Sequence, residues 1–223
     1  MNIKITEEQH KIFCDKFEYD TYLFGSYLFC TNNENSDRDY INVIKGNFDE
    51  EFITLGKYLP NFNTWQYDDV YNNNQIVWMT ERQFYQNLFS GDGHIIADII
   101  LLSGRFQNGL FLCRTYKIIK GYLGLVKRDL KFFDKNNKKR LHCLRGLYIA
   151  ECLIENRLPL VSEIQSLTFI DRLSIVDKLD VLRNRLNLLY DKNEINLYPD
   201  FKESADVIDL LVKSNNMKEF TYN

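Results

Sequence analysis

The apolar residues of this 223-residue chain change their spacing near Thr80, and this change constrains the fold more than any other feature. Before Thr80 they fall in short runs typical of β-strands, whereas from Glu81 onward they recur every three or four residues over long stretches. We therefore expect an α+β fold in which a small mixed β-sheet is followed by an all-helical lobe. We expect the first domain to cover 1–104 and the second to cover 105–223.

The first part of the chain predicts one helix and several short strands. Thr6 begins the helix with a capping-box sequence that Gln9 completes, and apolar residues repeat at helical spacing as far as Phe17. The expected strands are 21–24, 37–44, 52–55 and 75–80. The expected later helices are 81–89, 95–103, 108–133, 137–155, 168–189 and 204–211.

Apolar runs and cysteine spacing argue against a membrane-spanning protein, an exported protein and a Cys-x-x-Cys site. The longest apolar run, 95–102, is shorter than the roughly 20 residues that cross a membrane. Residues 1–9 lack the basic and apolar pattern of a signal peptide, so we expect a cytoplasmic protein without a membrane segment. The five cysteines include no Cys-x-x-Cys pair, which predicts buried, reduced thiols. They are Cys14, Cys30, Cys113, Cys143 and Cys152.

The candidate site is built from two short motifs that a spacer separates. Gly25 and Ser26 end an apolar strand, and after ten further residues Asp37 and Asp39 begin the next strand. Residues two apart in a strand face the same side, so both carboxylates are expected on one face of the sheet. Carboxylate oxygens are the ligands that Mg²⁺ or Mn²⁺ prefers, and metal ions held there would suit an in-line displacement at phosphorus.

The two motifs indicate a function only because they occur together. An isolated Asp-x-Asp pair is common on solvated strand edges, and a Gly-Ser pair by itself is a turn. Placed after an apolar strand, Gly25 lets the backbone approach a phosphate closely, and Ser26 offers it a hydroxyl and a backbone N–H. The combination therefore favours phosphoryl chemistry.

This combination resembles the nucleotidyltransferases of the DNA polymerase β superfamily, whose motif is Gly-Ser, a spacer and Asp-x-Asp. The resemblance implies that Asp37 and Asp39 are catalytic and hold Mg²⁺ or Mn²⁺, and that Gly25 and Ser26 bind the nucleotide. The implied reaction transfers a nucleoside monophosphate from an NTP to an acceptor hydroxyl. An RNA or tRNA end is the acceptor that we favour.

Two further segments are similar to the stand-alone nucleotidyltransferases associated with RNA repair. In that group a segment like 79–84 leads into a helix and a turn, here Gly91-Asp92-Gly93. A later helix carries Lys-x-x-x-His-x-x-Arg, which is matched by Lys138, His142 and Arg145. These residues are spaced to share one helical face, where they are expected to bind a triphosphate or a nucleic-acid end.

The same three residues end a strongly basic segment. Eleven Lys or Arg and two acidic residues lie between Cys113 and Arg145, a net charge of +9, whereas the rest of the chain carries −12. The segment is either a surface that receives phosphates or a solvated helix face. For the motif of Lys138, His142 and Arg145, the alternative is that His142 packs between helices and that Arg145 pairs with Glu151 or a carbonyl. The aromatic residues among the lysines either stack bases or belong to the core: Tyr116, Tyr122, Phe132 and Phe133.

The chain departs from the superfamily pattern at two positions. Members usually carry a third carboxylate on a neighbouring strand, and the position that matches here is the neutral Gln75. The available replacements are Asp68, Asp69 and Asp98, and the sequence does not choose between them. Relatives often have glycine where this chain has Cys30.

Two alternative functions stay open beside the transfer of a nucleotide to an RNA or tRNA end. The first is a non-catalytic nucleotide- or RNA-binding module that has lost the third carboxylate. The second is a nucleotidyltransferase of the toxin or phage-defence type, which acts on tRNA or on a protein. The sequence leaves open which NTP is used, which acceptor receives the nucleotide and which oligomeric state the protein adopts.

Overall fold

The computed structural model describes residues 2–32, 34, 36–45, 64–90, 94–106, 109–168 and 170–198. The chain divides after Gln86 into two compact units, with the short segment Leu28–Thr31 belonging to the second. The first unit contains a five-stranded mixed sheet and the second contains helices, which confirms the α+β class. The strand expected at 52–55, the helix expected at 204–211 and the turn at 91–93 lie outside the described residues.

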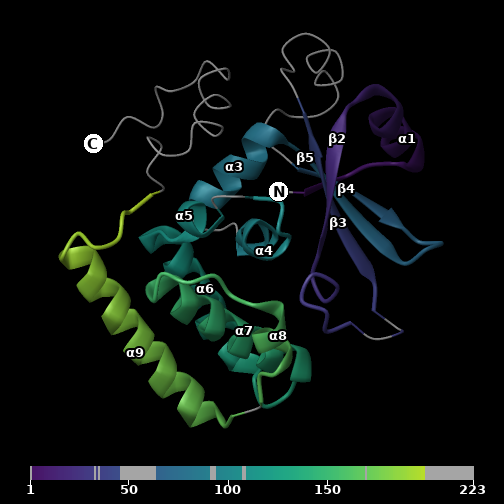
Figure 1. The fold of residues 1–223 in the computed structure, drawn as a ribbon. Helices are drawn as coiled ribbons and strands as arrows, with labels where there is room; N and C mark the ends of the chain where they lie inside the picture. Colours follow the sequence, from purple (N-terminus) through teal and green to yellow (C-terminus); the bar gives the residue numbers. More distant parts are fainter. Residues whose placement is uncertain are drawn as a thin grey trace. The chain divides into compact units, whose positions relative to one another are not determined.

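The sheet combines parallel and antiparallel pairs in the order β1-β4-β5-β3-β2 (Figure 1). The strands are β1 (Asn2–Lys4), β2 (Tyr19–Phe24), β3 (Arg38–Ile44), β4 (Thr64–Asp69) and β5 (Asn74–Thr80). β3 is antiparallel to β2 and parallel to β5, whereas β4 is antiparallel to β5 and parallel to β1. The C-terminal ends of β2 and β4 therefore lie at the same end of the sheet as the N-terminal ends of β3 and β5.

Three of the expected strands are confirmed with small shifts of their ends. β2 starts two residues earlier than expected, β5 one residue earlier, and β3 one residue later, so that Asp37 directly precedes the strand. β1 and β4 were not predicted. β1 has three residues, and the alternation in β4 rests on Trp65 and Tyr67 among polar residues, a pattern too short to separate from a loop.

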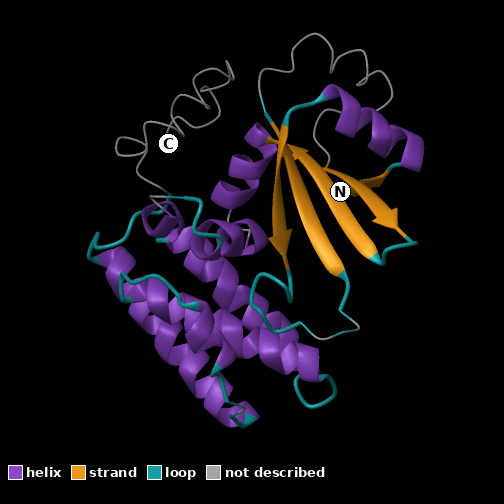
Figure 2. Ribbon diagram, turned by 45° about the vertical axis from the view of Figure 1, so that its right-hand side comes forward, coloured by secondary structure: helices purple, strands orange, loops and turns teal. Residues whose placement is uncertain are grey.

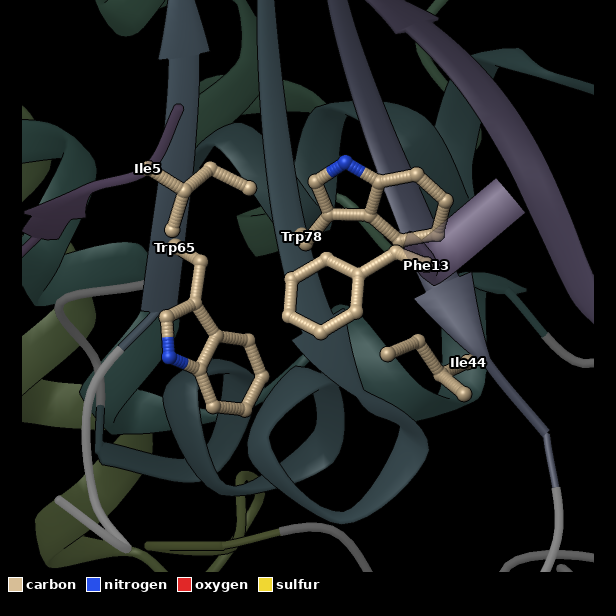
Figure 3. Packing of buried hydrophobic residues seen from close by; sticks show 5 residues of the cluster. All are labelled: Ile5, Phe13, Ile44, Trp65 and Trp78. Atoms are coloured by element: carbon tan, nitrogen blue, oxygen red, sulfur yellow. The ribbon is translucent and has the colours of Figure 1, made fainter. Parts of the chain in front are cut away.

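The helix α1 (Glu7–Lys16) closes one face of the sheet. The expected capping box is confirmed: Thr6 Oγ1 accepts from the Gln9 N–H at 3.2 Å, and Gln9 Oε1 accepts from the Thr6 N–H at 2.9 Å. Figure 3 shows the phenyl ring of Phe13 beside two indole rings, at centroid distances of 5.5 Å from Trp65 and 5.4 Å from Trp78. The resulting core cluster consists of Ile5, Phe13, Ile44, Trp65 and Trp78.

The opposite face of the sheet receives the beginning of α3 (Glu81–Ser90). Phe84 of α3 stacks on Tyr22 of β2, with ring centroids 5.7 Å apart and planes inclined by 25°. Tyr22 is paired with Ile41, and residues in register across neighbouring strands share a face. Because side chains alternate along β3, the face of Ile41 is also the face of Asp39.

His10 of α1 connects the helix to the sheet through its ring nitrogen. The Trp78 Nε1–H donates to His10 Nδ1 at 3.0 Å, and the His10 ring stacks on Tyr67 with centroids 4.4 Å apart. A ring nitrogen that accepts a hydrogen bond must be unprotonated, so the neutral ring with its hydrogen on Nε2 is the form that fits. The Sγ atom of Cys14 lies 3.7 Å from that Nε2.

The helical unit packs α6, α7 and α9 against one another (Figure 2). Gly146 of α7 allows a close approach to α6, since an added Cβ would lie 2.8 Å from Val126 Cγ2. The helices of this unit are α4 (His94–Leu102), α5 (Gly109–Cys113), α6 (Tyr116–Asp129), α7 (Asn137–Ile154), α8 (Val161–Gln165) and α9 (Arg172–Asp191), with a 3₁₀ turn at Leu130–Phe132.

Two of the expected helices were wrong in their extent. The single helix expected at 108–133 is broken after Cys113, because Thr115 is extended (φ −128°) and its side chain accepts from the Ile118 N–H to begin α6. The helix expected from residue 168 begins only at Arg172, where the Asp171 side chain provides the N-cap. The short helix α8 was not predicted.

The cysteines are free thiols, as expected. Cys113, Cys143 and Cys152 are buried, but Cys14 is half-buried and Cys30 is exposed, so the expectation of burial was wrong for these two. Cys30 lies in a turn and adopts φ +51°. None of the helices in the described ranges is long and apolar enough to cross a membrane.

The hydrogen bond from Trp78 predicts that His10 makes stability depend on pH. Burial lowers the pKa of His10, so below its unfolded value of about 6.5 the unfolded chain binds a proton that the folded protein resists. We expect the free energy of unfolding to fall as the pH drops from about 7.5 through 6.5. Chemical denaturation of the wild type and of His10→Gln over this range measures the effect. The variant keeps an acceptor and cannot titrate, so an equally steep fall in it would contradict the prediction.

Candidate functional site

The pairing of β2 with β3 brings the Gly-Ser turn and the Asp-x-Asp motif together. Phe24, the last residue of β2, is in register with Asp39. Gly25 follows with φ +67°, and a Cβ added to it would lie 2.9 Å from Asp39 Oδ2. The carboxylate of Asp39 therefore lies directly against the Gly25 backbone, although ten residues separate Ser26 from Asp37.

The residues around Asp39 differ in exposure and in face. Asp39 is half-buried, whereas Asp37 is exposed and lies just before the first residue of β3. Arg38, between them, points to the other face, where its guanidinium lies 5.2 Å from the Tyr27 ring centroid. The strand ladder does not include Asp37, so a shared face for the two carboxylates stays a prediction.

Gln75 occupies the position expected of a third carboxylate. It is in register with Asp39 on the parallel neighbour β5, and with Asp68 on β4 beyond it. These three side chains share one face of the sheet. Asp68 accepts from Lys4 Nζ at 2.7 Å and from Gln66 Nε2 at 2.6 Å, and these hydrogen bonds lower the pKa of Asp68. Asp68 therefore lies one strand beyond Gln75 and is paired with Lys4.

The other two candidate carboxylates serve local structure. Asp69, on the opposite face from Asp68, accepts from the Asn72 backbone N–H at 3.2 Å and from Asn72 Nδ2 at 2.7 Å, which holds the β4–β5 turn. Asp98 belongs to the helical unit, where the Tyr122 hydroxyl donates to Oδ1 at 2.6 Å. Burial raises the pKa of Asp98 to about 7.

A polar depression of about 520 Å³ lies where β3 and β5 begin. Its lining is rich in amides and hydroxyls, the groups that orient a polar ligand by hydrogen bonds. The asparagines in this lining follow β4 closely in the sequence, but the depression itself depends on how β3 and β5 lie side by side. The lining residues are Tyr27, Glu34, Ser36, Arg38, Asn72, Asn73 and Asn74.

The chemistry of Asp37 and Asp39 fits Mg²⁺ or Mn²⁺. Both ions prefer oxygen ligands, and Mg²⁺ is usually held by one or two carboxylates with substrate phosphates and waters completing its shell. The described residues contain no cluster of three or more His, Cys, Asp or Glu side chains able to hold a metal ion.

The cationic residues of α7 have separate surroundings. Lys138 is exposed, whereas His142 is half-buried and its Nδ1 lies 2.9 Å from Asp129 Oδ2. Arg128 and Lys139 also donate to the Asp129 carboxylate, at 2.8 and 3.2 Å. Burial raises the pKa of Asp129, but its hydrogen bonds lower it to about 2. His142 thus joins α7 to α6, which agrees with the interpretation that His142 packs between helices.

Arg145 is buried, with 9% of its surface exposed. Its guanidinium lies 4.1 Å from the Phe29 ring centroid, and its Nη1 has no hydrogen-bond partner within the described part of the chain. Glu151 instead accepts from Lys178 Nζ at 2.7 Å. Burial lowers the pKa of Arg145 and the nearby charge of Asp98 raises it, so the charge has a partner in the helical unit while the unpaired N–H group is costly.

The chain matches no protein-family model, no curated protein and no solved structure. The resemblance to the polymerase β superfamily therefore rests on the motifs and on the geometry that joins them. Gly25 and Cys30 both adopt positive φ, at +67° and +51°, in the segment between β2 and β3.

The contact between Gly25 and Asp39 predicts the effect of a single methyl group. Gly25→Ala should lower the free energy of unfolding by more than Gly104→Ala does. Both glycines have positive φ (+67° and +69°), so each alanine incurs backbone strain of about 1 kcal/mol, but nothing lies within 4 Å of an added Cβ at Gly104. Urea denaturation of both variants gives the difference. Equal losses would show that Asp39 does not lie against Gly25.

The unsatisfied guanidinium of Arg145 predicts that an apolar replacement is tolerated. Arg145→Met keeps a long side chain beside Phe29 and removes a buried charge, so we expect an unchanged free energy of unfolding or a gain of about 1 kcal/mol. Asp98 need not be left charged, because the charge of Arg145 lowers its pKa and removing that charge favours protonation. Denaturation near neutral pH checks this. A loss of several kcal/mol would instead make Arg145 a structural residue.

Proposed function

We propose that this protein is a metal-dependent nucleotidyltransferase that transfers a nucleoside monophosphate from an NTP to an acceptor hydroxyl, with an RNA or tRNA end as the acceptor. The observation that carries the proposal is the contact between the Asp39 carboxylate and the Gly25 backbone. Strand pairing brings the Gly25 turn and the Asp39 carboxylate together, and their residue types suit the binding of phosphate and of a metal ion. Neither motif alone supports this chemistry.

Each residue of the site has a distinct task in this proposal. Asp37 and Asp39 hold Mg²⁺ or Mn²⁺, which when bound neutralises phosphate charge and orients the triphosphate. Gly25, without a side chain, lets a phosphate approach the backbone, and Ser26 offers its hydroxyl. The acceptor oxygen bonds to the α-phosphorus while the bond to pyrophosphate breaks, and the hydroxyl proton passes to water.

Gln75 favours a second candidate function, a module that binds a nucleotide without transferring it. An amide next to Asp39 can orient a hydroxyl by hydrogen bonding, but it cannot accept its proton at neutral pH. Asp68, which shares the face, is engaged by Lys4 and Gln66. In this reading the NTP binds and stays intact.

Transfer of a labelled nucleotide tests the proposal. We expect the protein with Mg²⁺, an α-labelled NTP and total RNA to label the RNA, and Asp37→Asn with Asp39→Asn to reduce the rate by about 10³-fold, because the metal would lose both ligands. A matched control removes two exposed acids elsewhere, Asp15→Asn with Asp191→Asn, and should keep the wild-type rate.

The outcome at Gln75 separates the two candidate functions. If the wild type binds NTP without transfer, and Gln75→Asp gains transfer, the protein is a binding module with a degenerate site. If the wild type labels RNA and only the variant Asp37→Asn with Asp39→Asn loses this activity, the protein is an enzyme. RNA labelling that survives in this double variant would overturn both assignments.

A further inference from the structure

The helix α6 has two chemically different faces. One face is buried and supplies Ile118, Ile119, Tyr122, Leu123, Val126 and Asp129 to the helical unit. The other face consists of lysine, arginine and glycine and has no acidic residue: Lys117, Lys120, Gly121, Gly124, Lys127 and Arg128. The helix period of 3.6 residues keeps these six positions within about 120° of one another around the axis.

Within this face, the three lysines are not neutralised by the fold. Arg128 pairs with Asp129, but Lys117, Lys120 and Lys127 form no ion pair among the described residues. The ammonium groups of Lys117 and Lys120 instead lie 5.6 Å and 5.3 Å from the ring centroids of Tyr198 and Tyr116. We call Lys117, Lys120, Gly124 and Lys127 the lysine stripe.

Gly124 leaves the middle of the lysine stripe bare. Nothing lies within 4 Å of a Cβ added at this position, so packing does not require glycine there. Gly146 on α7 is different, because its added Cβ would lie 2.8 Å from Val126. Glycine lowers helix stability relative to alanine, and its benefit at an open position is that a ligand can approach the backbone closely.

We propose that the lysine stripe binds the phosphate backbone of single-stranded RNA. From Lys117 to Lys127 it extends for about 15 Å along the helix, enough for several successive phosphates. Proteins that bind single strands combine a cationic track with aromatic rings that stack the bases. Tyr116 and Tyr198 lie beside the lysines, and Phe132, 51% exposed, follows α6.

The surroundings of the stripe favour RNA over a lipid surface. A helix that lies on a membrane inserts its apolar face, but the apolar face of α6 is buried within the helical unit. Of the four aromatic residues of the basic segment, Tyr122 and Phe133 are core residues and Tyr116 packs on Tyr190 with ring centroids 4.5 Å apart, which leaves the exposed Phe132 for stacking. The stripe as an RNA site does not need the catalytic reaction, whereas its role as the acceptor site rests on the proposed function.

Fluorescence anisotropy with a labelled, unstructured RNA tests the stripe without NTP or metal ions. An RNA of about 20 nucleotides exceeds the roughly 4–16 nucleotides that single-strand-binding domains cover. The test variant carries Lys117→Gln, Lys120→Gln and Lys127→Gln. The control carries Lys11→Gln, Lys16→Gln and Lys192→Gln, three exposed lysines outside the stripe whose loss changes the net charge equally.

We expect the stripe variant to bind RNA at least about tenfold more weakly than the control in 0.1 M salt. The slope of log affinity against log salt should also fall by about 2, since each phosphate contact in a single strand contributes about 0.7. Gly124→Ala should weaken binding, because its methyl group keeps a phosphate away from the backbone, and Gly124→Glu should weaken it further, because the glutamate adds a repelling charge.

Several outcomes would overturn the inference. They are absence of RNA binding by the wild type, equal losses in stripe and control variants, tighter binding of DNA of the same sequence, and binding to anionic vesicles that exceeds binding to RNA. Circular dichroism of each variant must show an intact fold. If RNA binding depends on the stripe but no nucleotide is transferred, the RNA site is supported and the enzymatic function is rejected. Failure of the RNA site can therefore be distinguished from failure of the proposed enzymatic function.

Discussion

The hydrogen-bonded ladder of β3 with β2 and β5 is the constraint on which the first unit depends. It sets Asp39 against the Gly25 turn on one side and opposite Gln75 on the other. Because side chains alternate, the same strand sends Ile44 into the aromatic core beneath α1. Core and candidate site are therefore two faces of one structure, and a shift of register by one residue would exchange them.

Charged groups in this protein differ in how far the fold neutralises them. Asp68 and Asp129 are surrounded by hydrogen-bond donors that keep them ionised, and both hold neighbouring elements together. Among the described residues, Nη1 of Arg145 has no hydrogen-bond partner, and the three lysines on the solvent face of α6 form no ion pair. Charged side chains without such partners contribute little to folding. They are therefore the better candidates for binding a ligand.

The sequence predicted what local spacing controls. The capping box at Thr6 and the strand after Asp37 both followed from short-range patterns, whereas the place of Gln75 beside Asp39 was implied only by the family resemblance. It did not predict β4, because six residues with two apolar side chains resemble a loop until the neighbouring strands are known. Nor could it choose among the acidic residues: the hydrogen bonds of Asp68 join residues far apart in the chain.

The break between α5 and α6 has a consequence for how the chain tolerates changes in length. An inserted residue within a continuous helix rotates everything beyond it by about 100°. Because Thr115 restarts the helix through its own cap, an insertion ahead of it can be absorbed in the extended connection. The same insertion after Thr115 would turn the lysines toward the core and Ile118 toward solvent. Natural variation in length should therefore be confined to the connection, while α6 keeps its number of residues.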